Sequence, residues 1–572
     1  MKITGAGLII ELLEQRGVEF VAGVPGGAVL PLYDALGGSN RIRHVLARHE
    51  QAAGFIAQGM ARISGRAGVC FVTSGPGVTN VVTALADAKL DSVPLVCIAG
   101  QVSSHLLGTD AFQEVATLDI VRSVTKACYR VEFAHQIEDV VAAAFHTAEC
   151  GRPGPVLIDV PKDVQTAVIA VRDVYRRWQP AERAGMEESY RAALYDQAAM
   201  LIAAAERPLL YVGGGVIKAR AQALARRLVE RTDIPVTTTL MALGLLPQSH
   251  ELNLGMLGMH GARYTNHAVE AADLLVAIGA RFDDRATGDP RKFASRARII
   301  HIDIDPRELG KIKQPTLAIQ DDAAGALRQL LERADLLRSN SRSHWRARIA
   351  GLRKTHPLYM PRRDEICSPY GIMGALGEAM PSGSIVTTDV GQHQMWAAQA
   401  LPLSDAYRWL TSGGLGTMGF GLPAAIGAAL ATGDGPVVCI TGDGSLLMNL
   451  QELATLAELD LNVKLVLLDN AALGLVRQQQ ELFYQRRYVG SRYGRTVDFI
   501  AIARGFGLEA CDLGVAADPA QALRRALAGR GPALIRVPID ETEQVLPMVA
   551  PGAANIEPVD HPAVAAMMPG GR

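Results

Sequence analysis

The sequence predicts an α/β protein made of three doubly wound, parallel-sheet domains. Short apolar runs alternate with helical stretches in three blocks of the 572-residue chain, and polar segments separate the blocks. The length agrees with three or four domains of ordinary size. Hydrophobic residues make up 49% of the chain and charged residues 20%, which excludes a disordered, collagen-like or coiled-coil protein.

The first block is expected to cover residues 1–165. Its opening apolar stretch is interrupted by Glu11 and Glu14, which predicts an amphipathic helix rather than a signal peptide. Parallel βαβ units are predicted by the strand-like runs VEFVAGV, AGVCFVTS, VPLVCIAG and GPVLIDV. In the helix expected to begin near Glu50, apolar residues recur at helical spacing and predict a buried stripe of Ala53, Ile56, Met60 and Ile63.

The second block, residues 190–335, contains the strand-like runs PLLYVGGGV, IPVTTTL, DLLVAIGA and ARIIHIDID. An arginine-rich segment at about 333–363 follows, and a solvated linker helix is expected there. The third block, residues 366–550, contains SIVTTDVG, GPVVCITGDG, NVKLVLLDN and ALIRVPID, and residues 551–572 form a Pro/Gly-rich tail. Small-residue turns before helices in the first and third blocks give a weak indication of duplication.

Charge and cysteine usage narrow the class of protein. The 57 Lys and Arg residues nearly balance the 58 Asp and Glu residues, so no global field favours nucleic acid or an anionic membrane. The uncharged stretch from Trp409 to Thr432 is Gly-rich and contains a proline, which favours a buried loop and helix over a membrane span. Seven scattered cysteines without a CxxC pair are typical of a reducing compartment, and we expect a cytoplasmic enzyme.

A glycine-rich turn follows one of the apolar runs in the third block. In GPVVCITGDGSLLMN, Gly442 and Gly444 would let the backbone approach an anion at the start of a helix. Asp443 would lie at the carboxyl end of its strand, and the next strand-like run ends at Asn470. If the strands are parallel neighbours, the carboxylate, the amide oxygen and phosphate oxygens would suit Mg²⁺. A lone GDG is more often a simple turn, but the spacing to Asn470 favours the metal site.

These motifs resemble the thiamine-diphosphate-binding signature. Along the whole chain, similarity to the catalytic subunit of the acetohydroxyacid synthase (acetolactate synthase) family is carried by RHEQAAGFIAQGMAR, SGPGVTN, GTDAFQE, RPGPVLIDVPKDVQ, GARFDDR, DVGQHQMW and GGLGTMGFGLPAAIGA. The family usually has Asn-Asn where this chain has Asp469-Asn470. The resemblance implies a thiamine-diphosphate-binding fold with a central, FAD-binding, Rossmann-like domain, and thiamine diphosphate, Mg²⁺ and FAD as cofactors.

This resemblance changes the interpretation of Glu50. From the sequence alone it is a first-turn acid that stabilises the helix dipole. The resemblance implies instead that it binds N1′ of the thiamine aminopyrimidine and acts across a dimer interface. It also implies a metal shell of Asp443, Asn470 and the backbone carbonyl of Ala472. The implied cofactor contacts in the third block are Val390, Gly391, Gln392, His393, Gly416, Met418, Gly442, Gly444 and Ser445.

The middle block carries only a weak dinucleotide signal of its own, because YVGGGV lacks a clean GxGxxG pattern. GMLGMHG and GARFDDRATG, however, resemble the FAD-binding segments of acetohydroxyacid synthases. The implied FAD contacts are Arg152, Gly213, Gly214, Gly215, Thr239, Leu240, Met256, Gly258, His260, Gly279, Arg281, Asp303 and Asp322. Asp321 departs from the Gly or Ala of many relatives. Because the implied reaction has no net redox change, we expect a structural flavin.

Further positions match residues that contact substrate or intermediates in the family. These are Gly27 and Gln113, and the channel residues Phe112, Met259, Lys162, Arg285 and Gln479. Without the resemblance, Lys162 and Arg285 would be surface ion-pair residues, and Phe112 and Met259 would be core residues. Gln479 replaces a Trp that favours 2-oxobutyrate in many relatives, which predicts a weak preference for that acceptor.

The implied activity is that of an acetolactate synthase in branched-chain amino-acid biosynthesis. Pyruvate would be decarboxylated and its hydroxyethyl group joined to a second pyruvate or to 2-oxobutyrate. The expected assembly is a homodimer or tetramer with the active site at the subunit interface, joined by a small regulatory subunit. A thiamine- and FAD-dependent pyruvate oxidase is the alternative. An inactive homologue, a glyoxylate carboligase and an NAD-type dehydrogenase are less compatible with the motifs.

Overall fold

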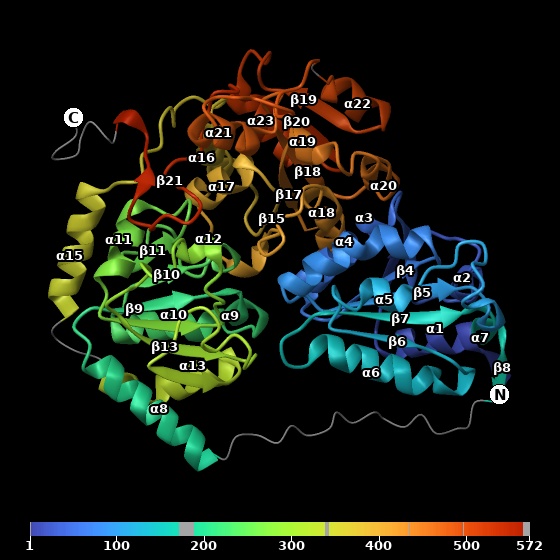
Figure 1. The fold of residues 1–572 in the computed structure, drawn as a ribbon. Coiled ribbons are helices and arrows are strands. Elements are labelled where there is room, and N and C mark those ends of the chain that lie inside the picture. The colour runs from blue at the N-terminus through green and yellow to red at the C-terminus, as the bar shows by residue number, and fades with distance from the viewer. Residues whose placement is uncertain (1, 171–187, 338–341, 434, 496, 564–572) are drawn as a thin grey trace.

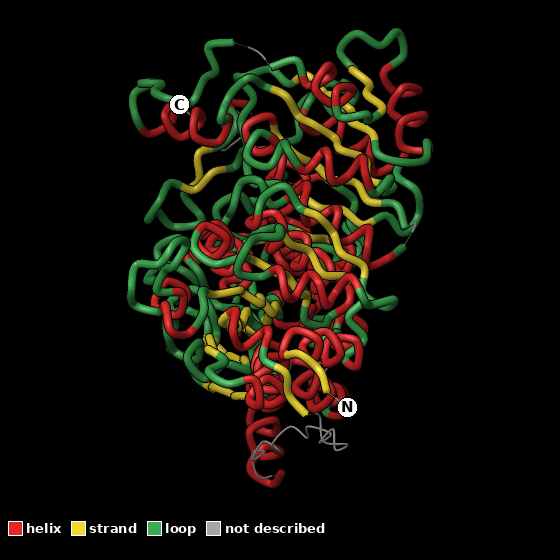
Figure 2. The backbone as a smooth tube through the Cα atoms, turned by 90° about the vertical axis from the view of Figure 1, so that its right-hand side faces the viewer, coloured by secondary structure: helices red, strands yellow, loops and turns green. Residues whose placement is uncertain are grey.

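Three six-stranded parallel sheets, each covered by helices, form the body of the molecule (Figure 1). The computed structural model describes residues 2–563 except 171–187, 338–341, 434 and 496. Part of the predicted polar segment after the first block and the end of the predicted tail therefore lie outside the described residues. In the side view of Figure 2, helices lie on both sides of the strands, as the doubly wound prediction requires.

The first sheet has the strand order β3-β2-β4-β5-β7-β6. Its strands are β2 (Phe20–Gly23), β3 (Arg43–Leu46), β4 (Gly68–Val72), β5 (Leu95–Gln101), β6 (Ala127–Arg130) and β7 (Pro155–Pro161), while β1 (Lys2–Thr4) pairs separately with β8 (Val168–Ala170). The helices are α1 (Gly5–Gln15), α2 (Leu30–Gly37), α3 (Glu50–Ser64), α4 (Pro76–Leu90), α5 (Thr117–Val121), α6 (Ile137–Glu149), α7 (Lys162–Thr166) and the short 3₁₀ turns η1 (Ser104–Leu106) and η2 (Ala134–Gln136).

The middle sheet has the order β11-β10-β9-β12-β13-β14, the strand order typical of Rossmann folds. Its strands are β9 (Pro208–Val212), β10 (Val236–Thr238), β11 (Asn253–Met256), β12 (Leu274–Ile278), β13 (Arg298–Asp303) and β14 (Leu317–Gln320). The helices are α8 (Glu188–Ala203), α9 (Gly214–Lys218), α10 (Gln222–Thr232), α11 (Arg263–Ala271), α12 (Asp284–Thr287), α13 (Ala323–Glu332), α14 (Ala334–Leu337), α15 (Arg342–Thr355) and the turn η3 (Leu240–Ala242).

The third sheet has the order β16-β15-β17-β18-β20-β19. Its strands are β15 (Ile385–Thr388), β16 (Trp409–Leu410), β17 (Val437–Gly442), β18 (Val463–Asp469), β19 (Glu509–Asp512) and β20 (Ala533–Pro538), followed by the β21 (Met548–Val549) and β22 (Pro558–Val559) pair. The helices are α16 (Pro369–Ala379), α17 (Gln392–Ala400), α18 (Gly421–Thr432), α19 (Asp443–Leu446), α20 (Glu452–Glu458), α21 (Gly474–Phe483), α22 (Phe499–Gly505), α23 (Pro519–Ala528) and the turn η4 (Ala406–Arg408).

The predicted fold class is confirmed: the chain contains three α/β units with parallel sheets. The first and third sheets also share one topology, because numbering the strands within each block gives the order 2-1-3-4-6-5 in both. This identity strengthens the indication of duplication. The boundaries assigned to the blocks remain predictions.

Helices α3 and α18 join the first block to the third (Figure 1). Both are rich in small residues, so their backbones approach closely. A Cβ atom on Gly59 would lie 2.2 Å from the carbonyl oxygen of Ala424, and one on Gly427 would lie 2.0 Å from that of Ile56. The predicted stripe of α3 contributes Ala53, Ile56 and Met60 to the shared core. The two blocks are therefore packed as one body through a shared apolar core.

The arginine-rich segment differs from its prediction in one respect. Its helix α15 exists, but the helix is not fully solvated, because Arg342, Trp345 and Ile349 are buried against the middle block. The Arg342 guanidinium donates to the Thr232 and Ile202 carbonyl oxygens. Burying the long side chain of an arginine becomes favourable when backbone carbonyls satisfy its donors.

The start of the predicted tail packs on the middle block instead of lying free. Asn555 donates from its side chain to the Ala286 carbonyl oxygen at 2.7 Å, and Arg263 forms an ion pair with Asp560. The Val549 N–H donates to the Met259 carbonyl oxygen at 2.9 Å. The segment around β21 thus lies over α11 and α12 (Figure 1).

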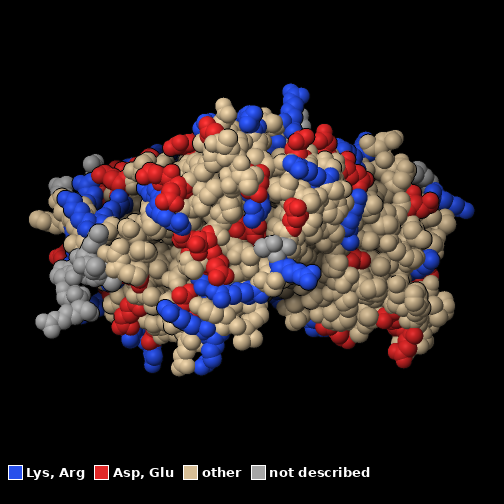
Figure 3. Space-filling view, turned by 90° about the horizontal axis from the view of Figure 1, so that it is seen from above, with Lys and Arg blue, Asp and Glu red and all other residues tan. Residues whose placement is uncertain are grey.

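Surface charge and hydropathy agree with the composition. On the face drawn in Figure 3, basic and acidic side chains are interspersed rather than gathered by sign. None of the helices in the described part of the chain is long and apolar enough to cross a membrane.

Candidate functional site

Two strand ends bring the predicted metal ligands together. Strand β17 pairs in parallel with β18, and the register sets Gly442 beside Leu468. Asp443 begins α19 directly after β17, and Asn470 directly follows β18. One backbone N–H, that of Ala472, donates to both side chains, at 3.2 Å to Asp443 Oδ2 and 3.3 Å to Asn470 Oδ1. The three candidate ligands therefore lie at one point on the carboxyl edge of the sheet.

Two carboxyl groups, those of Asp443 and Asp469, lie close together at this edge of the sheet. Burial, together with the neighbouring carboxylate of Asp469, raises the pKa of Asp443 to about 7. Asp469 forms an ion pair with Arg536, with 2.7 Å between its Oδ2 and the Arg536 Nε. Arg536 also contacts Asp512 at 2.8 Å. The negative charge of Asp469 is thus partly neutralised by Arg536 within the third block.

The donor set at this edge fits a hard divalent ion. A carboxylate, an amide oxygen and a backbone carbonyl are ligands that Mg²⁺ accepts. The described residues contain no group of three or more His, Cys, Asp or Glu side chains that could hold a metal by themselves. An ion at Asp443 would therefore need further oxygen ligands, which a diphosphate supplies.

The predicted diphosphate contacts surround this edge. Ser445 donates to the Val390 carbonyl oxygen at 2.8 Å, and Gln392 accepts from the Asn470 side chain at 3.1 Å. The buried His393 lies so close to Gly442 that a Cβ there would meet its Nδ1 at 2.7 Å. Among the described residues, His393 Nε2 has no hydrogen-bond partner. An unpartnered buried nitrogen beside a glycine turn is the kind of group that a polar ligand would satisfy.

Gly416 and Met418 lie on the loop that enters α18. Gly416 has φ +70°, a left-handed conformation that glycine adopts without strain. The Met418 Cε atom lies 3.5 Å from the position of a Cβ on Gly444, which brings this loop against the GDG turn. Three predicted segments that lie far apart in the sequence thus meet in one region: the GTMG loop, the GDG turn and the segment from Val390 to His393.

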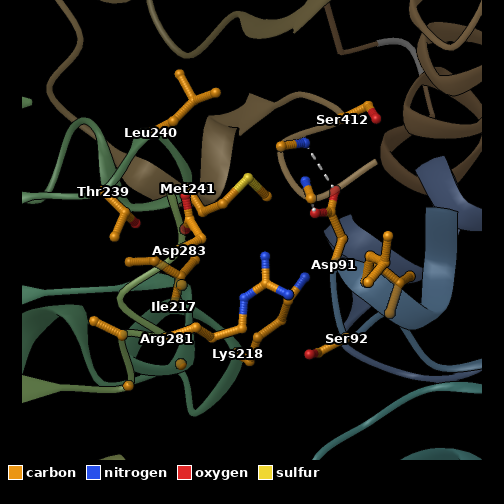
Figure 4. A pocket seen from close by; sticks show the side chains of 18 of the residues that line it. Asp91, Ser92, Ile217, Lys218, Thr239, Leu240, Met241, Arg281, Asp283 and Ser412 are labelled. Atoms are coloured by element: carbon orange, nitrogen blue, oxygen red, sulfur yellow. Dashed lines mark hydrogen bonds between the residues drawn. The ribbon is translucent and has the colours of Figure 1, made fainter. Parts of the chain in front are cut away.

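A cavity of about 910 Å³ opens between the three blocks. Asp91 and Arg152 of the first block, Lys218 and Thr239 of the middle block and the 412–416 segment of the third block contribute to its wall. Figure 4 shows Asp91 and Ser92 facing Lys218, Arg281 and Met241 across it. Its size is in the range of large ligand pockets.

Most predicted flavin contacts line this cavity. The eleven that do are Arg152, Gly214, Gly215, Thr239, Leu240, Met256, His260, Gly279, Arg281, Asp303 and Asp322. Gly213 and Gly258 do not line it, but each packs closely against the backbone of a lining residue, Gly279 and Arg285 respectively. Thr239 Oγ1 is buried without a hydrogen-bond partner among the described residues, so it could accept or donate to a ligand.

Two acidic flavin candidates already make internal contacts. Asp322 caps α13 by accepting from the Ala324 N–H at 3.0 Å. Asp303 accepts from the Asp305 N–H at 2.9 Å, and burial raises its pKa to about 6. Asp303 lies at the end of β13 and lines the cavity, where its carboxylate could accept from a ligand hydroxyl. The cavity therefore fits a dinucleotide in its size and in its glycine turn.

Three channel candidates line the same cavity: Met259, Arg285 and Gln479. Two thiamine-site candidates, Val390 and Gly416, line it as well. The predicted flavin and thiamine regions of one chain are thus contiguous, and the predicted substrate residues of the middle and third blocks lie where they meet.

Apart from Arg152, the candidates of the first block form a separate group. Glu50 is buried at the start of α3 and accepts from the Asn80 side chain at 2.9 Å. Gly75 approaches Gln113 so closely that a Cβ would meet its carbonyl oxygen at 2.8 Å. Around Gly27 a Cβ would meet no atom within 4 Å. Phe112 is 87% exposed, and Lys162 begins α7 at the end of β7.

Within one chain the two groups do not meet. Arg62, near the far end of α3, donates to the Thr411 carbonyl oxygen at 3.1 Å, beside the loop that carries Gly416. Glu50 begins the same helix, so the rise per residue sets it about 18 Å further along the axis. Glu50 therefore faces a different part of the surface from the cavity.

Sequence reasoning missed a group of charged residues between the blocks: Arg62, Asp87, Asp91 and Lys218. The carboxylates of Asp87 and Asp91 are buried, and Arg62 lies 2.7 Å from Asp91 Oδ2. Burial lowers the pKa of Lys218 to about 7. Two acids four residues apart in the largely apolar segment VVTALADAKLDSVP were a usable signal, because such acids need partners when buried.

Family models match all three blocks. They are the N-terminal TPP binding domain, the central domain and the C-terminal TPP binding domain of thiamine pyrophosphate enzymes, matched at residues 3–121, 195–330 and 389–537. The chain belongs to the thiamine pyrophosphate (thiamine diphosphate) enzyme family.

Within that family, the chain is similar over nearly its whole length to acetolactate synthase large subunits. Isozyme 1 of Escherichia coli K12 is 54% identical over 98% of each chain. Isozyme 2 of the same organism is 45% identical over 97% of this chain and 99% of its own. The large subunit of Corynebacterium glutamicum is 45% identical over 97% and 90%. The resemblance inferred from the sequence motifs is confirmed.

Proposed function

We propose that this protein is an acetolactate-forming, thiamine-diphosphate-dependent carboligase of branched-chain amino-acid biosynthesis. Pyruvate loses CO₂, and the remaining two-carbon unit is joined to a second pyruvate or to 2-oxobutyrate. The observation that carries this proposal is the convergence of Asp443, Asn470 and Ala472 beside the GDG turn, in a chain similar over its whole length to acetolactate synthase large subunits.

Thiamine diphosphate supplies a carbon nucleophile and an electron sink for decarboxylation. In our proposal, Asp443, Asn470 and the Ala472 carbonyl hold Mg²⁺, and the α19 N-terminus receives the diphosphate. Ser445, His393 and the backbone at Val390–Gln392 would complete this pocket. The Gly416 carbonyl would accept a hydrogen bond from the aminopyrimidine, and the Met418 side chain would pack against the cofactor.

Glu50 would be the general acid–base group of the site. Its carboxyl group would hold or release the proton at N1′ of a bound aminopyrimidine. Asn80 orients the carboxylate by donating to Oε2 at 2.9 Å. Gly27 and Gln113 lie with Glu50 on the first block and would contact the reacting substrate.

Two copies of the chain complete each site. The separation of Glu50 from the Gly416 loop along α3 supports this arrangement, since Glu50 must reach the aminopyrimidine. Exposed Phe112 and Lys162 would then line the channel of the partner's site, opposite Arg285, Met259 and Gln479. A homodimer, or a tetramer of two such dimers, satisfies this requirement.

FAD occupies the cavity between the blocks in our proposal. The unpartnered Thr239 hydroxyl, the glycine turn at Gly213–Gly215 and Asp303 support this assignment. The carboligation transfers no electrons overall, so the flavin has a structural role. The name "large subunit" carried by the relatives supports a small regulatory partner for this chain as well.

The test is product analysis with purified protein and pyruvate, omitting thiamine diphosphate, Mg²⁺ or FAD in turn. We expect acetolactate and CO₂ in equal amounts only when thiamine diphosphate and Mg²⁺ are present. Acetate or acetyl phosphate, with bleaching of the flavin by pyruvate, would identify the pyruvate oxidase alternative and refute the proposal.

A further inference from the structure

A buried ionic cluster connects the first block to the loop that carries Gly416. We define this cluster as Arg62, Asp87 and Asp91, and the loop as residues 412–417. The side chains of the three cluster residues are 5%, 0% and 1% exposed. They lie on the facing ends of α3 and α4, and Asp91 borders the cavity wall (Figure 4).

Asp91 binds the beginning of the 412–417 loop through its backbone. The N–H groups of Gly413 and Gly414 donate to its carboxylate at 3.2 and 2.7 Å. Gly414 must lack a side chain here, because a Cβ would lie 2.9 Å from Asp91 Oδ1. Burial alone would raise the pKa of Asp91, but Arg62 and these hydrogen bonds hold it below its usual range.

Asp87 binds both ends of the same loop. Ser412 and Thr417 donate their hydroxyls to Asp87 Oδ2, and the Thr417 N–H donates to Ser412 Oγ at 2.9 Å. The loop is therefore closed on itself through one carboxylate. Arg62 lies between the two acids and also donates to the Thr411 carbonyl oxygen.

A gain in stability alone does not explain this arrangement, because burying charged side chains carries a desolvation cost. Buried ion pairs often contribute no more to stability than apolar residues of the same size, and in some proteins they are retained because they specify one conformation. Here the conformation specified includes that of Gly416, with φ +70°, two residues before Met418. Lys218 of the middle block faces the same acids and lies on the cavity wall.

We propose that Asp87 and Asp91 are positioning residues for the thiamine site: they fix the 412–417 loop, and through it Gly416 and Met418, in the conformation that receives the cofactor. The inference rests on the proposed function. It implies that the first block of one chain serves two sites, by fixing this loop in its own third block and by presenting Glu50 elsewhere.

The test compares Asp91→Asn and Asp87→Asn with a matched control, Asp159→Asn. Asp159 is also fully buried and pairs with an arginine, Arg130 at 2.8 Å, but it lies in β7 away from the loop. Thiamine diphosphate affinity is measured in the full-length protein with Mg²⁺ by tryptophan fluorescence, since Trp409 lies next to the loop. Amide hydrogen exchange of residues 411–419 is measured on the same samples.

We expect the two cluster variants to weaken thiamine diphosphate binding by about tenfold or more and to speed exchange at Gly413, Gly414 and Thr417. Asp159→Asn should leave both within twofold of the wild type. Equal affinities in Asp91→Asn and Asp159→Asn would overturn the inference. A wild type that binds no thiamine diphosphate would instead refute the proposed function.

Ser412→Ala removes a loop hydroxyl that donates to Asp87 and leaves every buried charge in place. It therefore tests the inference if the aspartate variants fail to fold. It should weaken thiamine diphosphate binding while leaving the melting temperature close to that of Asp159→Asn or above it. An unchanged affinity in Ser412→Ala would contradict the inference.

Discussion

Asp443 lies beside a second acid, Asp469, and this would couple the proposed metal binding to pH. Because burial and Asp469 raise its pKa to about 7, Asp443 carries a proton over part of the neutral range. Mg²⁺ binds the ionised carboxylate, so the proton must leave first. We therefore expect the Mg²⁺ affinity to fall as the pH drops below about 7, by up to tenfold per unit, in calorimetric titrations at pH 5.5 to 8.5.

Asp469→Asn restores the residue common in the family and is the matched variant. Removing the neighbouring charge favours ionisation of Asp443, so the pH dependence should move to lower pH. An Mg²⁺ affinity independent of pH in both proteins would show that Asp443 is not a ligand.

Glu50→Gln should slow cofactor activation while leaving cofactor binding intact. An amide cannot exchange a proton with N1′, and loss of a general acid–base group costs on the order of 10²–10⁴-fold in rate. Acetolactate formation and thiamine diphosphate affinity are measured side by side. Glu452→Gln is the control, because Glu452 is another buried glutamate in the first turn of a helix and accepts from the Arg48 N–H at 2.9 Å. Equal turnover in Glu50→Gln and the wild type would remove Glu50 from the mechanism.

The expected preference between 2-oxobutyrate and pyruvate as the acceptor substrate depends on Gln479. It lines the cavity with Met259 and Leu475, where a polar amide offers little apolar contact to one extra methylene. Gln479→Trp should raise the preference for 2-oxobutyrate over pyruvate by about tenfold or more. Competition assays with both acceptors measure the ratio of products. A strong preference in the wild type would contradict this interpretation of Gln479.

Local patterns revealed some of these residues and not others. Asp443 and Asn470 could be found because each follows an apolar strand, and parallel strands end at one edge. The contact of Asp91 with Gly413 could not, because 322 residues separate them and neither position has a local signature. Likewise, no pattern in the sequence shows that Glu50 faces away from the Gly416 loop of its own chain.

At the scale of elements, the α3–α18 contact depends on glycine. Gly427→Ala should lower the denaturant midpoint, because its Cβ would meet the Ile56 carbonyl oxygen at 2.0 Å and forced overpacking costs about 1–3 kcal/mol. Gly351→Ala on α15 is the control, since a Cβ there meets no atom within 4 Å. It should raise stability by up to about 1 kcal/mol through helix propensity. Equal midpoints for the two variants would show that α18 moves aside without cost.

The predicted elements were mainly the central strands. Fully buried parallel strands such as β5 and β18 are continuous apolar runs and are visible in the sequence. Edge strands such as β14 and β19 are shorter and partly exposed, so their residues resemble loops. The buried side of α15 was also missed, because three buried residues are hidden among its many arginines.

At the scale of the whole molecule, the fold divides one proposed active site between two surfaces. The third block presents the proposed metal ligands at the carboxyl edge of its sheet, together with the 412–417 loop. The first block presents Glu50 at the opposite end of α3 from this loop. In a symmetric dimer each copy would supply one half to each of two sites. The middle block would then serve both halves, since its cavity borders the Gly416 loop.

The most direct measurement is acetolactate formation by two inactive variants expressed together, Glu50→Gln and Asp443→Asn. If two copies build each site, every mixed dimer contains one site with both residues intact. Random pairing then restores roughly a quarter of the wild-type activity per chain. Activity no higher than the sum of the separate variants would contradict the shared thiamine site.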